Sequence, residues 1–528
     1  MILFAAVVII ICLALSRFSS KVGLPTLAVF IGLGMLFGTD GLFRVAFDNY
    51  EFAEQICSVS LIFIMFYGGF GTNWKRAKAT APMAVLLSTA GVVVTAVLTG
   101  VFCRFVLGMD WLPALLVGSV ISSTDAASVF SILRSRRLNL RYGTASLLEV
   151  ESGSNDPFSY MMTFIVLTLM GGEASAGGMV WMMASQIVFG LAVGAVTAYI
   201  GRYLFRHIRL NGDGYDSMLI FAMALLSYGL ASVIGGNGYL SVYVTGLMLG
   251  NMPLHGKKTL VHFFDGVTGL MQILIFFLLG LLSCPSQLPE VALQGLLIAL
   301  FLTFVARPAA VFAVMSPFKC PLRQKLLVSW SGLRGAASIV FAIMATVNPA
   351  VTPSSLFNTV FFIVLFSIIL QGSLIPAVAR KLDMIDDEGD VMKTFSDYSE
   401  ETPVQFMKLH VTGKHPWAGK ELRHLRMTPQ TRIALILREG EEIIPRGETC
   451  IRLGDTIILS GPAMEGGDWG RLTEVTIDHD HDWCNRPLKV ISANQECHVV
   501  MIRRGTKTLI PDGSTVILKG DVLVVNDI

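Results

Sequence analysis

Residues 149–158 read EVESGSNDPF and run directly into the apolar stretch SYMMTFIVLTLM. Three carboxylates, two serines, an asparagine and a proline therefore stand at the head of an apolar segment. The surrounding chain has 528 residues, of which 53% are hydrophobic and 15% are charged, whereas soluble domains carry roughly 25% charged residues. The polar stretch is thus predicted to lie inside a membrane protein that also carries a soluble part.

Apolar runs long enough to cross a bilayer, about 20 residues each, recur throughout residues 1–381. The apolar start MILFAAVVIIICLALSRFSS is interpreted as the first of them rather than as a signal peptide, because its basic residues follow the apolar run. We count about thirteen such spans, near residues 2–16, 23–39, 53–73, 81–107, 111–133, 145–170, 178–204, 215–234, 238–252, 261–283, 290–316, 324–347 and 355–379.

Basic residues divide unevenly between the loops that join these spans. The loops after odd-numbered spans include Lys75 and Lys78 and the four arginines of residues 134–141, whereas the alternate loops hold Arg44 and Arg104. Basic loops stay on the cytoplasmic side of a membrane. We therefore expect a multi-pass protein of the cell inner (plasma) membrane, with its N-terminus outside and its C-terminal tail in the cytoplasm.

The composition changes after residue 381. Residues 382–402 form an acidic linker, and the tail that follows alternates apolar and polar residues as strands do. Residues 436–459 align with residues 501–524 if one inserted residue is allowed, and Trp417 and Trp483 begin the matching halves. The predicted domains are a transmembrane domain (1–381), the linker (382–402) and two copies of one module (403–471 and 472–528). The predicted fold is a polytopic α-helical membrane protein with a small β-rich α+β cytoplasmic tail.

The polar stretch places carboxylates deep in the membrane. Asp156 lies 15 residues beyond Arg141, which puts it roughly 20 Å into the membrane layer at 1.5 Å per residue. On a helix, Glu149, Ser152 and Asp156 share one face. Pro157 has no amide hydrogen, so a backbone carbonyl one turn earlier is left free near the carboxylate, where a cation could use it.

A second polar break, SVISSTDAASVF, lies in the fifth span and contains Ser122, Ser123, Thr124 and Asp125. Hydroxyl, carboxylate and frayed carbonyl oxygens suit a hard monovalent cation, and broken helices of inverted repeats that meet at the midplane are a recurring way to build such a site. Asp125 could be either a ligand or a stabiliser of the helix crossing.

The third polar feature is Arg334 in SWSGLRGAASIVF. An unpaired arginine at this depth costs at least about 2.5–3.5 kcal/mol, so we expect a carboxylate partner, and Glu151 is the first choice. This pair is interpreted as structural. Arg307 is another buried cation, and the sequence does not indicate its partner.

ESGSNDP, SSTDAAS and SGLRGA, in this order and at these spans, resemble the NhaP-type monovalent cation:proton antiporters. The tail modules are similar to the RCK-C or TrkA-C domains carried by the potassium/proton branch of that family. The resemblance implies that Asp156, Asn155, Ser152, Thr124 and Asp125 bind the cation or proton and that Glu151 and Arg334 form a helix-bridging ion pair. It also implies a homodimer, in which a transport core moves against a dimerisation core, and a role in pH regulation and cation homeostasis. Many relatives have an acidic residue where this chain has Tyr67, which we assign to packing.

The predicted activity is secondary active transport rather than enzyme catalysis. Because Asp156 can hold a proton or a metal ion but not both, we expect electroneutral 1:1 exchange of K⁺ for H⁺ by alternating access. A Na⁺/H⁺ antiporter would use the same residues. More distant alternatives are a tail-gated cation channel and an intramembrane aspartyl hydrolase with Asp125 and Asp156 as its dyad.

The tail is expected to regulate exchange, and the resemblance raises cyclic di-AMP as its ligand. Residues 478–482, DHDHD, are interpreted as a solvated loop because they lack the spacing of a defined metal site. Apart from membrane lipid and the transported ions, we expect no cofactor, no further metal and no nucleic acid.

Overall fold

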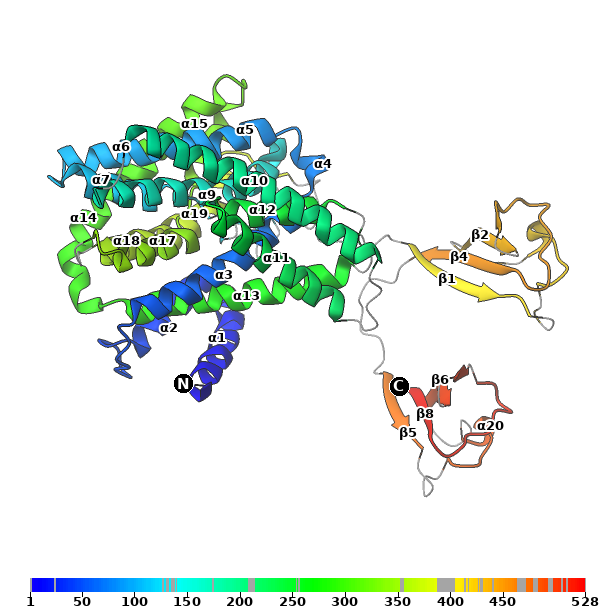
Figure 1. The fold of residues 1–528 in the computed structure, drawn as a ribbon. Coiled ribbons are helices and arrows are strands. Elements are labelled where there is room, and N and C mark those ends of the chain that lie inside the picture. Colours follow the sequence, from blue (N-terminus) through cyan, green and yellow to red (C-terminus); the bar gives the residue numbers. More distant parts are fainter. Residues whose placement is uncertain are drawn as a thin grey trace. The chain divides into compact units, whose positions relative to one another are not determined.

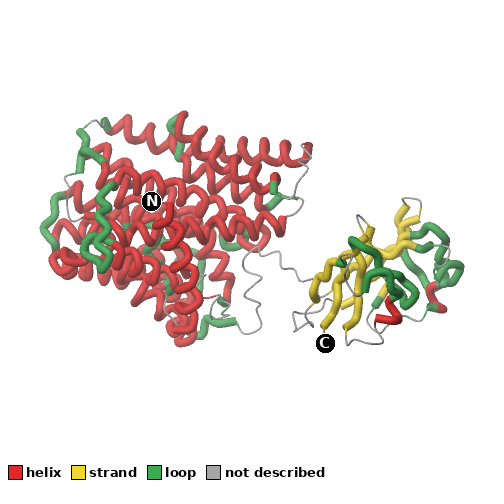
Figure 2. Tube along the Cα trace, turned by 90° about the horizontal axis from the view of Figure 1, so that it is seen from below, coloured by secondary structure: helices red, strands yellow, loops and turns green. Residues whose placement is uncertain are grey.

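The computed structural model describes residues 2–22, 25–125, 128–129, 133, 138, 140–172, 175–207, 214–252, 254, 257–351, 356–386, 404–412, 415, 417–425, 427, 431–438, 441–462, 472–477, 483–491, 497–504, 507–509 and 511–527. Arg134, Arg136 and Arg137, most of the predicted linker and the run 478–482 lie outside these residues. The chain divides into two compact units, Met1–Ser399 and Glu400–Ile528. The first is helical and the second is rich in strands (Figure 1, Figure 2).

Helices occupy every range in which an apolar span was predicted. They are α1 (Ile2–Val22), α2 (Thr26–Phe37), α3 (Tyr50–Gly71), α4 (Trp74–Ala77), α5 (Ala81–Leu86), α6 (Val92–Phe105), α7 (Trp111–Val120), α9 (Thr144–Met170), α10 (Ala176–His207), α11 (Tyr215–Val233), α12 (Gly238–Gly250), α13 (Lys257–Leu282), α14 (Leu288–Phe301), α15 (Arg307–Met315), α16 (Leu322–Trp330), α17 (Ala336–Val347), α18 (Leu356–Phe366) and α19 (Ser373–Lys381).

Three π-helical segments continue longer helices: η1 (Leu87–Gly91), η4 (Leu302–Ala306) and η5 (Ser367–Gly372). Short 3₁₀ turns precede α9 and α14, at η2 (Arg141–Gly143) and η3 (Pro285–Gln287). Within the described residues, seven helices are long and apolar enough to cross a membrane. The polytopic helical class is confirmed, and the count of thirteen spans stays a prediction.

The helices of the first unit pack in two groups. In the first group, α12 packs against α3, α10 and α11, and α13 packs against α2 and α3. In the second group, α9 packs against α5 and α7, α7 also packs against α6, and α17 packs against α18. Contacts of α17 with α3 and of α9 with α12 join the groups. The polar helix α9 thus lies at the boundary between them.

Two helices of the second group are interrupted by non-helical backbone. The helix begun by α7 ends at Val120 and is followed by the non-helical residues 122–125. The helix α16 ends at Trp330, and the non-helical residues 332–335 lead into α17. The two breaks touch, because the amide of Asp125 donates to the carbonyl of Leu333 at 2.8 Å. Backbone that leaves the helix at membrane depth must find such partners. The prediction of broken helices is therefore confirmed.

The second unit contains two four-stranded antiparallel sheets of the same design. The first has the order β1-β4-β2-β3 and the second β5-β8-β6-β7, with the strands β1 (Val404–His410), β2 (Arg432–Arg438), β3 (Glu441–Ile443), β4 (Thr456–Pro462), β5 (Leu472–Thr476), β6 (Cys497–Arg504), β7 (Lys507–Leu509) and β8 (Asp521–Asp527). A 3₁₀ turn, η7 (Leu422–His424), and a short helix, α20 (Leu488–Ile491), complete the described elements.

Equivalent side chains in the two sheets make equivalent contacts. Arg438 clamps Asp455 through two hydrogen bonds of 2.8 Å, and Arg504 clamps Asp521 through bonds of 2.8 and 2.7 Å. These hydrogen bonds lower the pKa of both aspartates. Equivalent residues of the two sheets are 66 positions apart, so Ile436 corresponds to Ile502. The predicted alignment with one inserted residue was therefore wrong. A slip of one residue would turn the inward side chains of a strand to the opposite face of the sheet, so the strand pairing fixes the shift at 66 residues in both halves.

Candidate cation-binding site

The α9 helix carries Asp156 near its middle, facing the non-helical break that follows α7. Asp156 is 9% exposed, and its Oδ1 accepts a hydrogen bond from the hydroxyl of Ser123. The Oδ1 of Asn155 lies 3.4 Å from that hydroxyl. The buried carboxylate thus contacts a neutral hydroxyl of a neighbouring segment.

Thr124 joins the same break to α9 through two further contacts. The Nδ2 of Asn155 donates to Oγ1 of Thr124 at 2.5 Å, and the hydroxyl of Ser152 donates to the Thr124 carbonyl at 2.8 Å. Ser152, Asn155 and Asp156 therefore all face residues 123–124. The structure brings together four of the five predicted ligands, Asp156, Asn155, Ser152 and Thr124, around one small region.

Asp125 points its carboxylate at the helix that resumes after the break. Its two oxygens accept hydrogen bonds from the amide of Ser128 at 3.2 Å and from the hydroxyl of Ser128 at 2.5 Å. A Cβ added to Gly335 would lie 1.9 Å from Oδ2 of Asp125, so only glycine fits there. Of the two predicted roles for Asp125, this geometry favours the stabiliser of the crossing.

Arg334 is buried and hydrogen-bonds to the break at residues 122–125. Its Nη1 donates to the carbonyls of Ser122 and Ser123 at 2.7 and 2.6 Å. These carbonyls have no helical partner because the chain is not helical there, and a charged donor compensates for their burial. The amide of Arg334 in turn donates to the hydroxyl of Ser367 in the π segment η5, at 3.0 Å. Arg334 therefore holds open the unwound backbone that faces Asp156.

The ion pair predicted for Glu151 and Arg334 is corrected by the structure. Oε1 of Glu151 lies 2.6 Å from Nη1 of Arg307, and both side chains are buried. Arg307 begins α15, and Gly332 leaves room for its guanidinium, since a Cβ there would lie 2.8 Å from Nε of Arg307. Glu151 is thus paired with Arg307, whose partner the sequence did not indicate, while Arg334 donates to backbone carbonyls.

Comparison with known proteins agrees with this architecture. The family described as "Sodium/hydrogen exchanger, transmembrane" matches residues 5–381. The chain belongs to this family. The members of this family are transporters. Residues 409–463 and 472–525 each match the TrkA-C domain, which confirms the two tail modules of this sodium/hydrogen exchanger family member.

Curated relatives of this family member include potassium antiporters. It is 34% identical over 470 residues to the K(+)/H(+) antiporter NhaP2 of Shewanella sp. (strain MR-4), covering 87% of this chain and 80% of the relative. It is also 34% identical over 465 residues to the K(+)/H(+) antiporter NhaP of Alkalimonas amylolytica, with the same coverage. Among solved structures, the sodium proton antiporter MjNhaP1 from Methanocaldococcus jannaschii at pH 8 is similar, with a TM-score of 0.63, 25% identity, and coverage of 70% of this chain and 98% of that chain.

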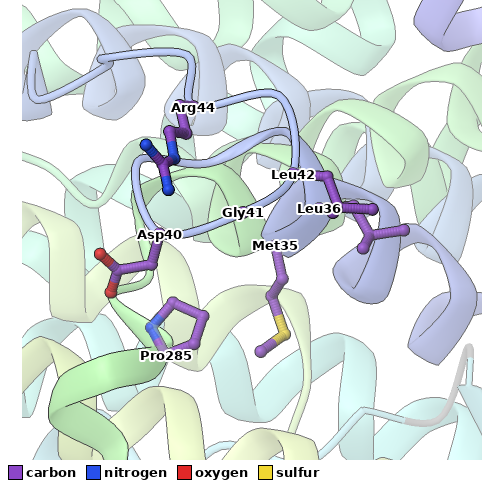
Figure 3. A pocket seen from close by; sticks show the side chains of 7 residues that line it. All are labelled: Met35, Leu36, Asp40, Gly41, Leu42, Arg44 and Pro285. Atoms are coloured by element: carbon purple, nitrogen blue, oxygen red, sulfur yellow. The ribbon is translucent and has the colours of Figure 1, made fainter.

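Two further features of this family member lie outside the Asp156 region. The hydroxyl of Tyr67 on α3 donates to Oδ1 of Asp265 on α13 at 3.2 Å, so Tyr67 makes a polar contact as well as packing. A pocket between the end of α2 and η3 is lined by Met35, Leu36, Asp40, Gly41, Leu42, Arg44 and Pro285 (Figure 3). This pocket contains none of the predicted ligands, which lie instead at the buried crossing.

One residue of the site was missed in the sequence analysis. Ser123 contacts the carboxylate of Asp156 directly, yet the prediction treated it only as part of a polar run. A signal was present, since Ser122, Ser123 and Thr124 stand together in an apolar span. However, only the backbone path decides which of three successive hydroxyls points at the carboxylate.

Proposed function

We propose that this protein exchanges K⁺ for H⁺ across the membrane and that Asp156 carries both ions in turn. The observation that supports this most is the environment of Asp156, which accepts a hydrogen bond from the Ser123 hydroxyl, while the buried arginines Arg307 and Arg334 bond elsewhere. Among the described residues, Asp156 forms no ion pair with a basic side chain, and an intramembrane carboxylate in such a setting is suited to a mobile cation. The relatives named as K(+)/H(+) antiporters support K⁺ as the substrate.

The proposed ligands are Asp156 and the polar side chains that lie beside it at the contact between α9 and residues 123–124. We assign Asp156 as the shared carrier, with Asn155, Ser152 and Thr124 contributing neutral oxygens and Asp125 holding the crossing in shape. A proton and a metal ion compete for the same carboxylate oxygens, so one replaces the other. If only the two loaded forms cross the membrane, exchange is obligatory and one charge moves in each direction.

Dye-quenching assays in everted membrane vesicles test the activity. Vesicles with the wild-type protein are expected to release protons from an acidified lumen when K⁺ is added, and Asp156→Asn should reduce this response to that of empty vesicles. Asp265→Asn is the matched control, because it also removes an aspartate from a membrane helix of the first unit and should retain exchange. Full activity of Asp156→Asn would refute the proposed carrier.

The stoichiometry has a separate test. Electroneutral 1:1 exchange predicts that proteoliposomes show K⁺-driven proton movement with no net current and no dependence on an imposed membrane potential. A substantial transport current on a solid-supported membrane would contradict the 1:1 ratio while leaving exchange itself intact.

Na⁺ is the alternative substrate. It is favoured by the similarity to the sodium proton antiporter MjNhaP1, which is weaker in identity than the similarity to the K(+)/H(+) antiporters. Proton release with K⁺, Na⁺, Rb⁺ and Li⁺, each measured at several pH values, distinguishes the two. Family membership favours exchange over a tail-gated channel.

The two TrkA-C modules are proposed to regulate exchange from the cytoplasm. We propose cyclic di-AMP as a ligand of the tail, on the resemblance of these modules to regulators of potassium transport, and pH regulation as the physiological output. Isothermal titration of residues 400–528 with cyclic di-AMP tests the ligand, and an absence of heat would remove it.

Assembly and orientation are also proposals. A homodimer is expected from the resemblance, and the mass of the protein in lipid nanodiscs tests it. The uneven distribution of basic loop residues supports an external N-terminus and a cytoplasmic tail in the inner membrane. Labelling of cysteines introduced at the two ends in intact and permeabilised cells tests the orientation.

A further inference from the structure

We infer that Ser123 is an additional ligand of the transported cation and that its hydroxyl contributes to the choice between K⁺ and smaller ions. This inference rests on the proposed function of Asp156 and extends it by one specificity-determining residue. Ser123 lies in the non-helical break after α7, is 2% exposed, and donates its hydroxyl hydrogen to Oδ1 of Asp156.

The position of this hydroxyl is fixed from the backbone side. The Ser123 carbonyl accepts a hydrogen bond of 2.6 Å from Nη1 of Arg334. The carbonyl is therefore held by the guanidinium, while the side chain of the same residue contacts the carboxylate. Arg334 acts on the site as a positioning residue through Ser123.

A serine hydroxyl can exchange roles when a cation arrives. It carries one hydrogen to donate and two lone pairs to accept, so in the absence of a cation it donates to Asp156. A cation that binds the same carboxylate oxygen would displace this hydrogen bond, and the hydroxyl would then turn a lone pair toward the cation. The Oδ1 of Asn155, 3.4 Å from the Ser123 hydroxyl, belongs to the same cluster of oxygens.

Neighbouring hydroxyls differ from Ser123 in what they contact. The hydroxyl of Ser159, three residues beyond Asp156 on α9, donates to the Ser119 carbonyl at 2.7 Å and accepts from Ser122 at 3.1 Å. These bonds join α9 to α7 and do not involve a carboxylate. Among the hydrogen bonds of the described residues, the one that reaches Asp156 from a hydroxyl comes from Ser123.

Loss of the Ser123 hydroxyl should affect large and small cations differently. Selectivity among monovalent cations depends on the number and strength of the coordinating oxygens. Smaller ions give up bound water more reluctantly, so a water that fills the space left by the hydroxyl serves Na⁺ or Li⁺ better than K⁺. The site should therefore lose affinity for K⁺ and lose part of its preference for K⁺ over Na⁺.

The test compares initial exchange rates of the full-length protein in everted vesicles across a range of K⁺ and Na⁺ concentrations at one pH. Ser123→Ala should raise the K⁺ concentration for half-maximal rate about ten-fold, the loss expected for one contact between a hydroxyl and a charge. The maximal rate, normalised to the amount of inserted protein, should stay within about two-fold, which separates a ligand from a general packing role. Ser123→Thr keeps the hydroxyl and should restore the wild-type half-maximal concentration.

The matched control is Ser159→Ala. It removes a similarly buried hydroxyl that bonds to Ser119 and Ser122 rather than to Asp156, and it should leave the K⁺ concentration for half-maximal rate unchanged. If Ser123→Ala does not insert, Ser123→Cys replaces it and should raise that concentration, because sulfur is a poor ligand for a hard cation. Unchanged K⁺ and Na⁺ dependence in the inserted variant, or an equal change in Ser159→Ala, would overturn the inference. Wild-type vesicles that show no cation-dependent proton release would instead refute the proposed function.

Discussion

The pairing of Glu151 with Arg307 gives the sharpest energetic prediction. The two charged atoms lie 2.6 Å apart, and the side chains are 1% and 4% exposed. Removing one partner of a buried pair costs about 3–5 kcal/mol because the other charge stays buried without compensation. We therefore expect Arg307→Gln and Glu151→Gln each to destabilise the protein by about that amount.

The double variant shows whether the two residues act as a pair. Glu151→Gln with Arg307→Gln leaves no buried charge at this position, so its destabilisation should be smaller than the sum of the single effects by a few kcal/mol. The assay is denaturant unfolding of the purified full-length protein in mixed micelles. Arg323→Gln is the control, because its ion pair with Asp383 is more than half exposed and should contribute less than about 1 kcal/mol.

The reasoning is refuted if the measured coupling free energy of Glu151 is larger with Arg334 than with Arg307. Arg334 bonds to the carbonyls of Ser122 and Ser123 rather than to Glu151. The combination of Glu151→Gln with Arg334→Gln should therefore be closer to additive than the combination with Arg307→Gln. A larger coupling with Arg334 would show that the original sequence-based pairing was right and the geometry wrong.

Three more predictions concern the crossing, α12 and the tail. Gly335→Ala should abolish vesicle exchange without preventing insertion, because the added Cβ would lie 1.9 Å from Oδ2 of Asp125. Asn237→Ala should destabilise the protein by about 2–3 kcal/mol in denaturant unfolding, because the side chain caps α12 and also donates to the Pro157 carbonyl at 2.9 Å. Acid should destabilise the first tail sheet, because hydrogen bonds from Arg438 lower the pKa of Asp455 in the folded protein. The stabilising contribution of Asp455 is therefore complete above its unfolded pKa of about 3.9. It is lost as the pH falls through the pKa of Asp455 in the folded protein. Hydrogen–deuterium exchange of β4 at pH 7 and in acid measures this loss.

Each of these predictions has a matched comparison. Gly266→Ala on α13 adds a Cβ that meets no described atom within 4 Å, so it should keep exchange, and equal activity of the two glycine variants would count against the crossing. Asn358→Ala removes an exposed amide bond to Gln287 and should cost less than about 1 kcal/mol. Asp455→Asn should make β4 exchange less dependent on pH, and an unchanged pH profile would argue against Asp455 as its source.

The membrane helices were predictable because a bilayer imposes one simple requirement. Backbone groups inside it must be hydrogen-bonded, and a helix does this within its own segment, so long apolar runs indicate where helices lie. The helix α9 required a further argument, since its polar first half makes it less apolar than the other spans. The depth of Asp156, counted from Arg141, was enough to identify it as the central residue.

Residues brought together across the site were predictable where they were close in sequence. Ser152, Asn155 and Asp156 share a helix, and their common orientation follows from helical geometry. Thr124 was singled out by the polar break and by the resemblance, and it contacts Ser152 and Asn155. Ser123 was missed because residues 122–125 are not helical, and no helical periodicity indicates which side chain of such a break faces a neighbouring helix.

The exchange of partners between Arg307 and Arg334 has the same physical origin. Sequence counting places both arginines at a similar depth, but it measures height along the membrane and not position around a helix axis. Arg307 lies on a continuous helix, where backbone carbonyls already have helical partners, so its charge requires a carboxylate. Arg334 lies in a break and meets the unpaired carbonyls of Ser122 and Ser123 first. Arg334 is thus compensated by these backbone carbonyls and, at longer range, by Glu151, which leaves Asp156 available for the transported ion.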